Sequence, residues 1–308
     1  MDKTREALYS LLGDLPGREL NISSRLVAVD EEYNESFILE SLVLELNGIE
    51  PVPAYFTRPK NAKPPYPTIL YSHFHDGNYK LGKDELLTKN VQFTPDTYVF
   101  NVSYAEALAK LGIACLAIDH WCFGERSGRS ESETFKSMLW RGRVLWGMMV
   151  YDSLKALDYL ETRNDVDMSR IGTLGRSMGS TMSIWVSALD KRVKTCVDTC
   201  CLTDFEELER ENNLDGHGIY YYVPSLLKYF SMADINALIA PRPHLSTAGI
   251  YDHLTPLTGL KKIEGILKEV YIEKGEPNNF VLKTYPCGHL ETREMREDVL
   301  HFICETLI

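Results

Sequence analysis

No stretch of the 308-residue sequence reaches the roughly 18 consecutive apolar residues that a membrane-spanning helix needs. The opening residues, "MDKTREALYSLLGDLPG", also lack the apolar core of a signal peptide. They predict instead a short amphipathic helix within residues 1–20 that ends near Gly13 and Pro16. We therefore expect a cytoplasmic protein.

The sequence is also poor in positive charge and has no paired cysteine motif. Its 33 Lys and Arg residues against 44 Asp and Glu give a formal charge of -11, which opposes binding to nucleic acid and to anionic membranes. The seven cysteines are odd in number and lack C-x-x-C spacing, so reduced, buried thiols are favoured over a disulfide framework. Internal repeats and low-complexity tracts are absent as well.

The apolar runs predict an α/β fold. Residues 24–33 and 37–59 have strand character with a turn at Asn47 and Gly48, which predicts antiparallel strands at one edge of a sheet. Beyond the proline-rich stretch "PKNAKPPYP", strands alternate with helices, so the rest of the sheet is expected to be mostly parallel and doubly wound. The predicted strands there cover residues 68–73, 113–119, 170–177, 193–200, 243–250 and 279–286.

Four helices are predicted between these strands, at 104–112, about 136–163, 179–190 and 257–275. The second is long, and one face of it is expected to be buried because apolar residues recur at three- and four-residue steps: Trp146, Met149, Val150, Leu154, Leu157 and Leu160. Arg141 and Arg143, two apart on this helix, should point in different directions, so a structural role is favoured over anion recognition.

Residues 202–240 are longer than an ordinary crossover and contain three consecutive tyrosines. Two interpretations stay open: an inserted helical lid over the site, or a helical excursion that packs on the sheet. In either case we expect residues 1–308 to form a single domain.

The strongest motif is "RIGTLGRSMGS", residues 170–180, in which Gly175-Arg176-Ser177-Met178-Gly179 gives G-x-S-x-G between a predicted strand and a predicted helix. In this context the serine is expected on a strained turn, exposed to substrate, with the Met178 N–H donating to an oxyanion. The alternative is a glycine-rich helix cap with no catalytic role.

A serine nucleophile needs a base and an orienting acid, and the order expected for this elbow is serine, acid, histidine. Asp252 and His289 each follow a predicted strand at its carboxyl end, where open α/β sheets place their sites. Asp198 is the alternative acid, and His253 is expected at the rim of the site.

The segments "GRSMGS", "GIYDHLTP" and "CGHLE", with "ILYSHFHDG" and "IDHWCFGER" upstream, resemble the α/β-hydrolase superfamily in the branch of dienelactone hydrolases and acetyl xylan esterases. The resemblance covers roughly residues 50–305 and implies the α/β-hydrolase fold and serine esterase chemistry on Ser177, Asp252 and His289. Dienelactone hydrolases proper use a cysteine nucleophile, so their specific reaction does not transfer to Ser177.

The same resemblance assigns "SHFHDG" to the oxyanion loop. His73 matches the family histidine and His75 the oxyanion-hole residue, while Phe74 replaces the usual glycine, so the N–H of either Phe74 or His75 completes the hole with that of Met178. The alternative, a zinc site, would need ligands such as Asp119 and His120 in addition, and the spacing does not match known metallo-hydrolases. We expect no metal and no cofactor.

Three side chains are candidates for contact with substrate: Phe74, Trp121 and His217. Core packing of the aromatics and a solvated loop position for His217 are the competing explanations. Glu125 and Arg126 are expected to form a local ion pair.

These residues predict a hydrolase that cleaves carboxylic esters with small acyl groups, such as acetyl esters of carbohydrates, through an acyl-enzyme intermediate. Its expected partner is a small-molecule ester, and a homo-oligomer stays open. The alternatives are a serine peptidase of the prolyl oligopeptidase type that acts on short peptides, and a non-catalytic ligand-binding protein on the same fold.

Overall fold

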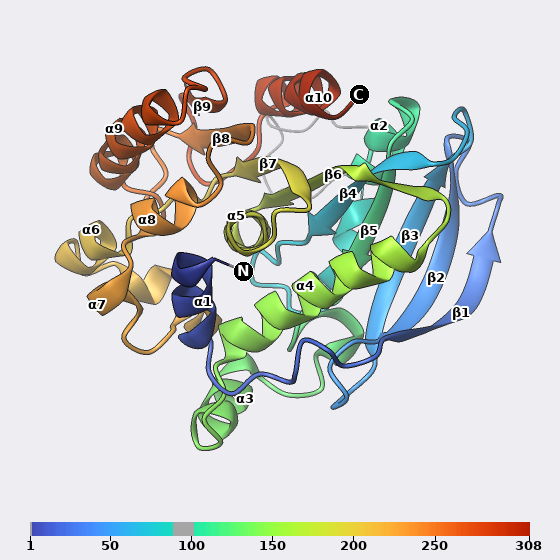
Figure 1. Cartoon of the computed structure of the whole chain (residues 1–308), viewed down its shortest axis with the longest axis horizontal. Coiled ribbons are helices and arrows are strands. Elements are labelled where there is room, and N and C mark those ends of the chain that lie inside the picture. The colour runs from blue at the N-terminus through green and yellow to red at the C-terminus, as the bar shows by residue number, and fades with distance from the viewer. Residues whose placement is uncertain (1, 89–101) are drawn as a thin grey trace.

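The computed structural model describes residues 2–88 and 102–308. Within them, nine strands form one sheet with the order β1-β2-β3-β5-β4-β6-β7-β8-β9 (Figure 1). The strands at the β1 end pair antiparallel, and β4 to β9 pair parallel. The bounds are β1 Ser23–Asp30, β2 Phe37–Glu45, β3 Val52–Pro59, β4 Tyr66–Ser72, β5 Ala114–Ile118, β6 Val166–Arg176, β7 Val193–Thr199, β8 His244–Gly249 and β9 Phe280–Tyr285.

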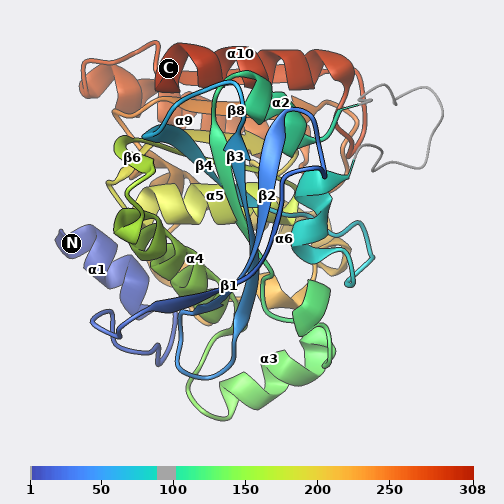
Figure 2. The same ribbon diagram turned by 90° about the vertical axis from the view of Figure 1, so that its right-hand side faces the viewer.

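Helices cover both faces of the sheet (Figure 2). On one face α2 (Tyr104–Lys110) and α10 (Arg293–Leu307) enclose an apolar cluster, and on the other α4 (Leu145–Thr162) and α5 (Met178–Leu189) enclose a larger one. The other α-helices of the described residues are α1 Lys3–Ser10, α3 Glu131–Leu139, α6 Phe205–Arg210, α7 Leu226–Tyr229, α8 Met232–Ala237 and α9 Leu257–Glu273. The predicted doubly wound sheet with antiparallel N-terminal strands is confirmed.

The predicted long helix is wrong, because it is two helices, α3 and α4, joined by a turn at residues 140–144. Gly142 has a φ of +72°, a conformation that glycine adopts without strain. The Gly142 carbonyl accepts from the Asp14 N–H at 2.8 Å, and Arg143 forms a β-bridge with Gly13. Pairing with the N-terminal segment therefore breaks the helix that local periodicity favours.

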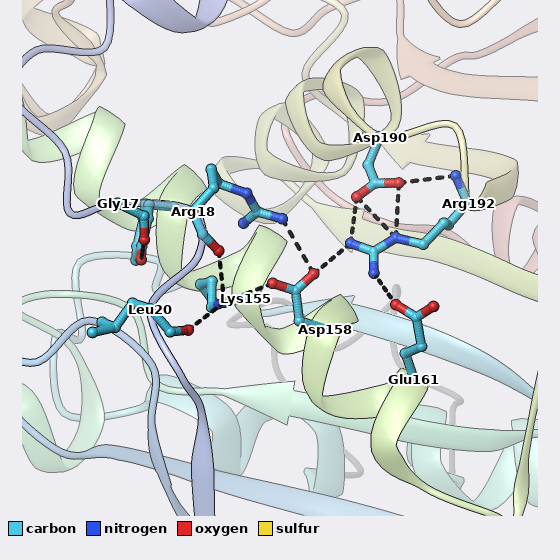
Figure 3. A network of polar contacts seen from close by, with 9 residues as sticks. Gly17, Arg18, Leu20, Lys155, Asp158, Glu161, Asp190 and Arg192 are labelled. Atoms are coloured by element: carbon cyan, nitrogen blue, oxygen red, sulfur yellow. Dashed lines mark hydrogen bonds and ion pairs between the residues drawn. The ribbon is translucent and has the colours of Figure 1, made fainter. Parts of the chain in front are cut away.

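The apolar residues predicted to form one face of α4 are buried, but the opposite face is covered too. The Lys155 side chain, 4 % exposed, donates to the carbonyls of Arg18 at 3.2 Å and Leu20 at 2.9 Å (Figure 3). Asp158 accepts from Lys155 at 2.8 Å and from Arg192 at 2.7 Å. The N-terminal segment is thereby held on α4, which shields that helix from water on its outer side.

The segment at residues 202–240 contains α6, α7 and α8. Leu208, Tyr220 and Ile235 are buried, and most of the apolar side chains of this segment pack into the same cluster as α4 and α5. The segment therefore contributes to the core. Its opening as a lid, and the single-domain division of residues 1–308, stay predictions.

Two further findings concern the described part of the chain as a whole. All seven cysteines are free thiols, and five of them are buried. None of the described helices is both long and apolar enough to cross a bilayer.

Candidate active site

Ser177 lies on the sharp turn between β6 and α5, with φ 53° and ψ -119°. A non-glycine residue with this backbone conformation is strained, and such strain concentrates at functional sites. The two glycines of the motif are required by close approaches. A Cβ on Gly175 would lie 2.2 Å from the Gly179 carbonyl, and one on Gly179 would lie 1.9 Å from the Ser72 carbonyl. These contacts place Ser177 beside the end of β4.

Ser177, His289 and Asp252 form one hydrogen-bonded line. The His289 Nε2 atom lies 2.8 Å from the Ser177 Oγ, and its Nδ1 atom lies 2.7 Å from the Asp252 Oδ2. With the carboxylate holding the proton on Nδ1, the Nε2 lone pair faces the serine hydroxyl. The three residues follow β6, β8 and β9 at the carboxyl edge of the parallel strands. The arrangement is chemically competent to activate the serine as a nucleophile.

Asp252 is buried, 3 % exposed, and its second oxygen accepts from the Leu254 N–H at 2.9 Å. The alternative acid, Asp198, has other partners: it accepts from His244 at 2.7 Å and from Ser246 at 2.8 Å in the middle of the sheet. His253 is exposed beside Asp252, as expected for a rim residue. Of the two aspartates, only Asp252 contacts His289 in the described structure.

The loop at residues 73–76 packs against the start of α5, where a Cβ on Gly179 would also lie 2.9 Å from the His73 carbonyl. The first N–H groups of a helix have no intrahelical acceptor, so the Met178 N–H is available to a ligand at this point. His73 is a buried anchor: its Nε2 atom accepts from the His120 N–H at 3.2 Å. Burial lowers the pKa of His73 to about 3, so its ring is neutral.

His75 is held on both sides of its ring. Its Nδ1 atom accepts from the Gly77 N–H at 3.1 Å, and its Nε2 atom lies 2.7 Å from the Tyr220 hydroxyl. The ring also packs on Tyr79 and Phe123, with centroid distances of 4.9 Å and 5.2 Å. Burial, above all, lowers the pKa of His75 to about 4. A neutral imidazole therefore borders the site.

Sequence reasoning missed Tyr220 and Tyr79 as neighbours of His75. The run of three tyrosines at 220–222 drew attention to the segment but not to a particular hydroxyl. Burial and contact with a loop more than 140 residues away distinguish Tyr220 from Tyr222, and a single sequence carries no signal for either.

The three candidates for substrate contact lie in different places. The Phe74 ring is buried, 1 % exposed, beneath the Arg176 guanidinium at 3.9 Å. Trp121 is 7 % exposed and packs against Arg126 at 4.4 Å. His217 is half-buried, and its Nε2 atom donates to the Leu254 carbonyl at 3.0 Å. A substrate contact by any of them stays a prediction.

The expected ion pair between Glu125 and Arg126 is wrong. Glu125 pairs with Lys83 at 2.6 Å, while Arg126 pairs with Glu50 at 2.6 Å and with Asp152 at 2.9 Å. Consecutive residues of this short 3₁₀ turn project in different directions, so each finds a distant partner.

The residues considered as zinc ligands form other contacts within the protein. Asp119 pairs with Lys83 at 3.1 Å, and the His73 and His120 rings pack at a centroid distance of 4.8 Å. The described residues contain no group of three or more His, Cys, Asp or Glu side chains that could hold a metal ion.

Comparison with known proteins adds a family match. The family model of acetyl xylan esterase (AXE1) matches residues 17–234. The Bacillus subtilis (strain 168) protein YtaP, named as a hydrolase, is 48% identical over 299 residues, which cover 97% of each chain.

Solved structures share the fold at lower identity. A glucuronoyl esterase from Solibacter usitatus is 16% identical, with a TM-score of 0.71 over 98% of this chain and 91% of that one. An acetyl xylan esterase from Paenibacillus sp. R4 is 18% identical, with a TM-score of 0.65 over 99% of this chain and 92% of that one. These likenesses confirm the predicted α/β-hydrolase fold.

Proposed function

Because the chain belongs to the acetyl xylan esterase (AXE1) family, we propose that it is a serine esterase that removes small acyl groups, such as acetate, from carbohydrate esters. Family membership makes it a hydrolase of carboxylic esters. The observation that supports a serine mechanism is the line of hydrogen bonds from Ser177 through His289 to Asp252.

In the proposed reaction, the Ser177 hydroxyl attacks the ester carbonyl while His289 Nε2 takes its proton. The carbonyl oxygen becomes an oxyanion that the Met178 N–H and the N–H of Phe74 or His75 stabilise. His289 then gives its proton to the leaving alcohol, which leaves an acyl-serine. Water, deprotonated by His289, attacks this acyl-serine, and His289 returns the proton to the Ser177 oxygen as the acid leaves. Asp252 keeps the imidazole in the working tautomer throughout.

The nucleophile is tested by Ser177→Ala with p-nitrophenyl acetate as substrate. We expect kcat to fall by about 10³-fold or more, the scale for loss of a triad member, with an unchanged circular dichroism spectrum. Ser169→Ala, an exposed serine near the opposite end of β6, is the matched control and should keep wild-type turnover. A Ser177→Ala protein with near-normal kcat would refute the assignment.

The choice of substrate distinguishes the proposed esterase from the peptidase alternative. Aminoacyl p-nitroanilides assayed beside p-nitrophenyl esters should give turnover with the esters alone, since the family match is to esterases. Faster cleavage of the anilides would favour the peptidase. The non-catalytic alternative predicts that a fluorophosphonate probe fails to label Ser177, because only an activated serine reacts with it.

A further inference from the structure

A cavity of about 560 Å³ lies outside the catalytic residues, at the same edge of the sheet. It is bordered by the loop after β5, the turn between β2 and β3, and the α3 region, and it is open to solvent, with Arg129 and Arg141 exposed. Its volume falls in the range of sites for small organic ligands. Four arginines and two glutamates are among its lining residues: Arg126, Arg129, Arg141, Arg143, Glu50 and Glu125.

The charges in this cavity are unbalanced. Glu50 pairs with Arg126, and Glu125 pairs with Lys83, so neither carboxylate neutralises the other three arginines. Arg141 donates to the Ser137 carbonyl and hydroxyl. Within the described part of the chain, Arg129, Arg141 and Arg143 form no ion pair with a carboxylate. In a chain with a formal charge of -11, three arginines without carboxylate partners form a positively charged patch.

This juxtaposition exists because the predicted long helix is broken. On a continuous helix Arg141 and Arg143 would point apart, whereas the turn at 140–144 brings both to one cavity.

Aromatic surface accompanies the charge. Trp121 lines the cavity, and Trp140, directly before Arg141, is 94 % exposed. An indole face packs well on the C–H face of a sugar ring, and arginine binds carboxylates with a two-pronged fork. Cys122 lines the cavity while its neighbour Phe123 contacts His75 at a centroid distance of 5.2 Å, so the cavity and the catalytic site lie on two sides of one loop.

We propose that this cavity is a subsite for a sugar carboxylate, so that the esters cleaved at Ser177 are carried on acidic oligosaccharides. The inference that acidic sugars carry the cleaved ester rests on the proposed esterase function, whereas the binding of an acidic sugar to the cavity does not. A monosaccharide acid fits the cavity volume, the three arginines without carboxylate partners and the Trp121 side chain in the lining together, whereas a small inorganic anion uses only the arginines.

The test measures binding by isothermal titration calorimetry in the Ser177→Ala protein, with sodium D-glucuronate, D-glucose and inorganic phosphate as probes. Glucuronate should bind and glucose should not. Arg141→Gln together with Arg143→Gln should weaken glucuronate binding by about 10-fold or more, the scale for losing a charge-assisted hydrogen bond. Arg25→Gln, an exposed arginine on β1, is the matched control and should bind as the parent protein does.

The thermal midpoint of each variant shows that a loss of binding is not a loss of fold. Glucuronate binding that is absent, or equal in the parent and the double variant, would overturn the proposal. Phosphate binding as tight as glucuronate binding would overturn its sugar component. Since the parent protein here lacks the nucleophile, failure of the esterase assignment appears only in the p-nitrophenyl acetate assay and leaves this result unaffected.

Discussion

The Nε2 atom of His75 lies 2.7 Å from the hydroxyl of Tyr220, and this contact links the loop beside Ser177 to the segment between β7 and β8. Because the His75 Nδ1 atom accepts from the Gly77 N–H, the neutral ring carries its proton on Nε2 and donates it to Tyr220. The Gly77 N–H thus fixes the tautomer of His75, and Tyr220 fixes the position of its ring. The backbone N–H of His75 or that of Phe74 is proposed to bind the oxyanion.

We expect Tyr220→Phe to lower kcat/KM for p-nitrophenyl acetate by about 2- to 10-fold, because one net hydrogen bond of about 0.5–1.5 kcal/mol is lost from the oxyanion loop. Steady-state kinetics check this. The control is Tyr222→Phe, whose hydroxyl bonds to the Leu214 carbonyl at 2.9 Å and does not reach His75. Equal kinetics in the two variants would show that Tyr220 does not position the loop.

The choice of acid gives a second prediction. Asp252→Asn should lower kcat by about 10⁴-fold, because an amide cannot hold His289 in the working tautomer. Asp198→Asn should leave the kcat of the folded protein unchanged and lower the free energy of unfolding by about 1–3 kcal/mol. The reason is that the NH2 group of the introduced amide would face one of two buried hydrogen-bond donors, His244 or Ser246. Kinetics and urea unfolding measure the two effects, and an exchange of the two phenotypes would move the acid to Asp198.

Much of this arrangement could be predicted from the sequence because it is local. The elbow, the strands and the turn at Asn47 and Gly48 each depend on residues close together in the chain. The strands show as short apolar runs, and the elbow shows as a glycine-flanked serine between a strand and a helix. The elbow motif implies the order serine, acid, histidine, and the carboxyl ends of two later predicted strands then indicated Asp252 and His289.

What could not be predicted depends on contacts between distant segments. The break between α3 and α4 follows from pairing with Gly13, and the arginine cavity follows from that break. The partners of Glu125 and Arg126, and the contact of Tyr220 with His75, join residues 26 to 145 positions apart. Local periodicity contains no information on such pairings, so tertiary packing overrides it.

A third prediction concerns pH. Glu85 is buried, and desolvation raises its pKa from 4.5 to about 7, although the Tyr71 hydroxyl donates to it. A carboxyl whose pKa is higher in the folded state binds more protons there than in the unfolded state. Its ionisation therefore costs stability, and this cost is absent below pH 4.5, grows as the pH rises and is complete above about pH 7.

Glu85→Gln removes the ionisation and keeps an acceptor for Tyr71. We expect the variant and the wild type to have similar thermal midpoints near pH 4.5, and the variant to be more stable at pH 8 by an amount of the order of 3 kcal/mol. Thermal unfolding across this pH range checks it. Glu276→Gln, on the exposed loop after α9, is the control. A difference between Glu85→Gln and wild type that does not vary with pH would contradict the linkage.

The last prediction separates two roles for His217. Its Nε2–H donates to the Leu254 carbonyl, and the Leu254 N–H donates to the Asp252 carboxylate, so His217 supports the loop that carries the proposed acid. Its ring is also fixed by packing against Phe205 and Tyr221, at centroid distances of 5.3 Å and 5.4 Å. These contacts favour a positioning residue over one that binds substrate.

His217→Ala should therefore lower kcat by about 10-fold with KM unchanged, because an interaction that supports the transition state is weakened while ground-state binding is not. His217→Gln keeps an N–H donor and should recover part of the loss. His301→Ala, an exposed histidine on α10, is the control. A direct substrate contact would give the opposite pattern, in which KM rises for His217→Ala and kcat stays constant. Saturation kinetics with a short-chain p-nitrophenyl ester distinguish the two, because kcat and KM are then measured on the same substrate.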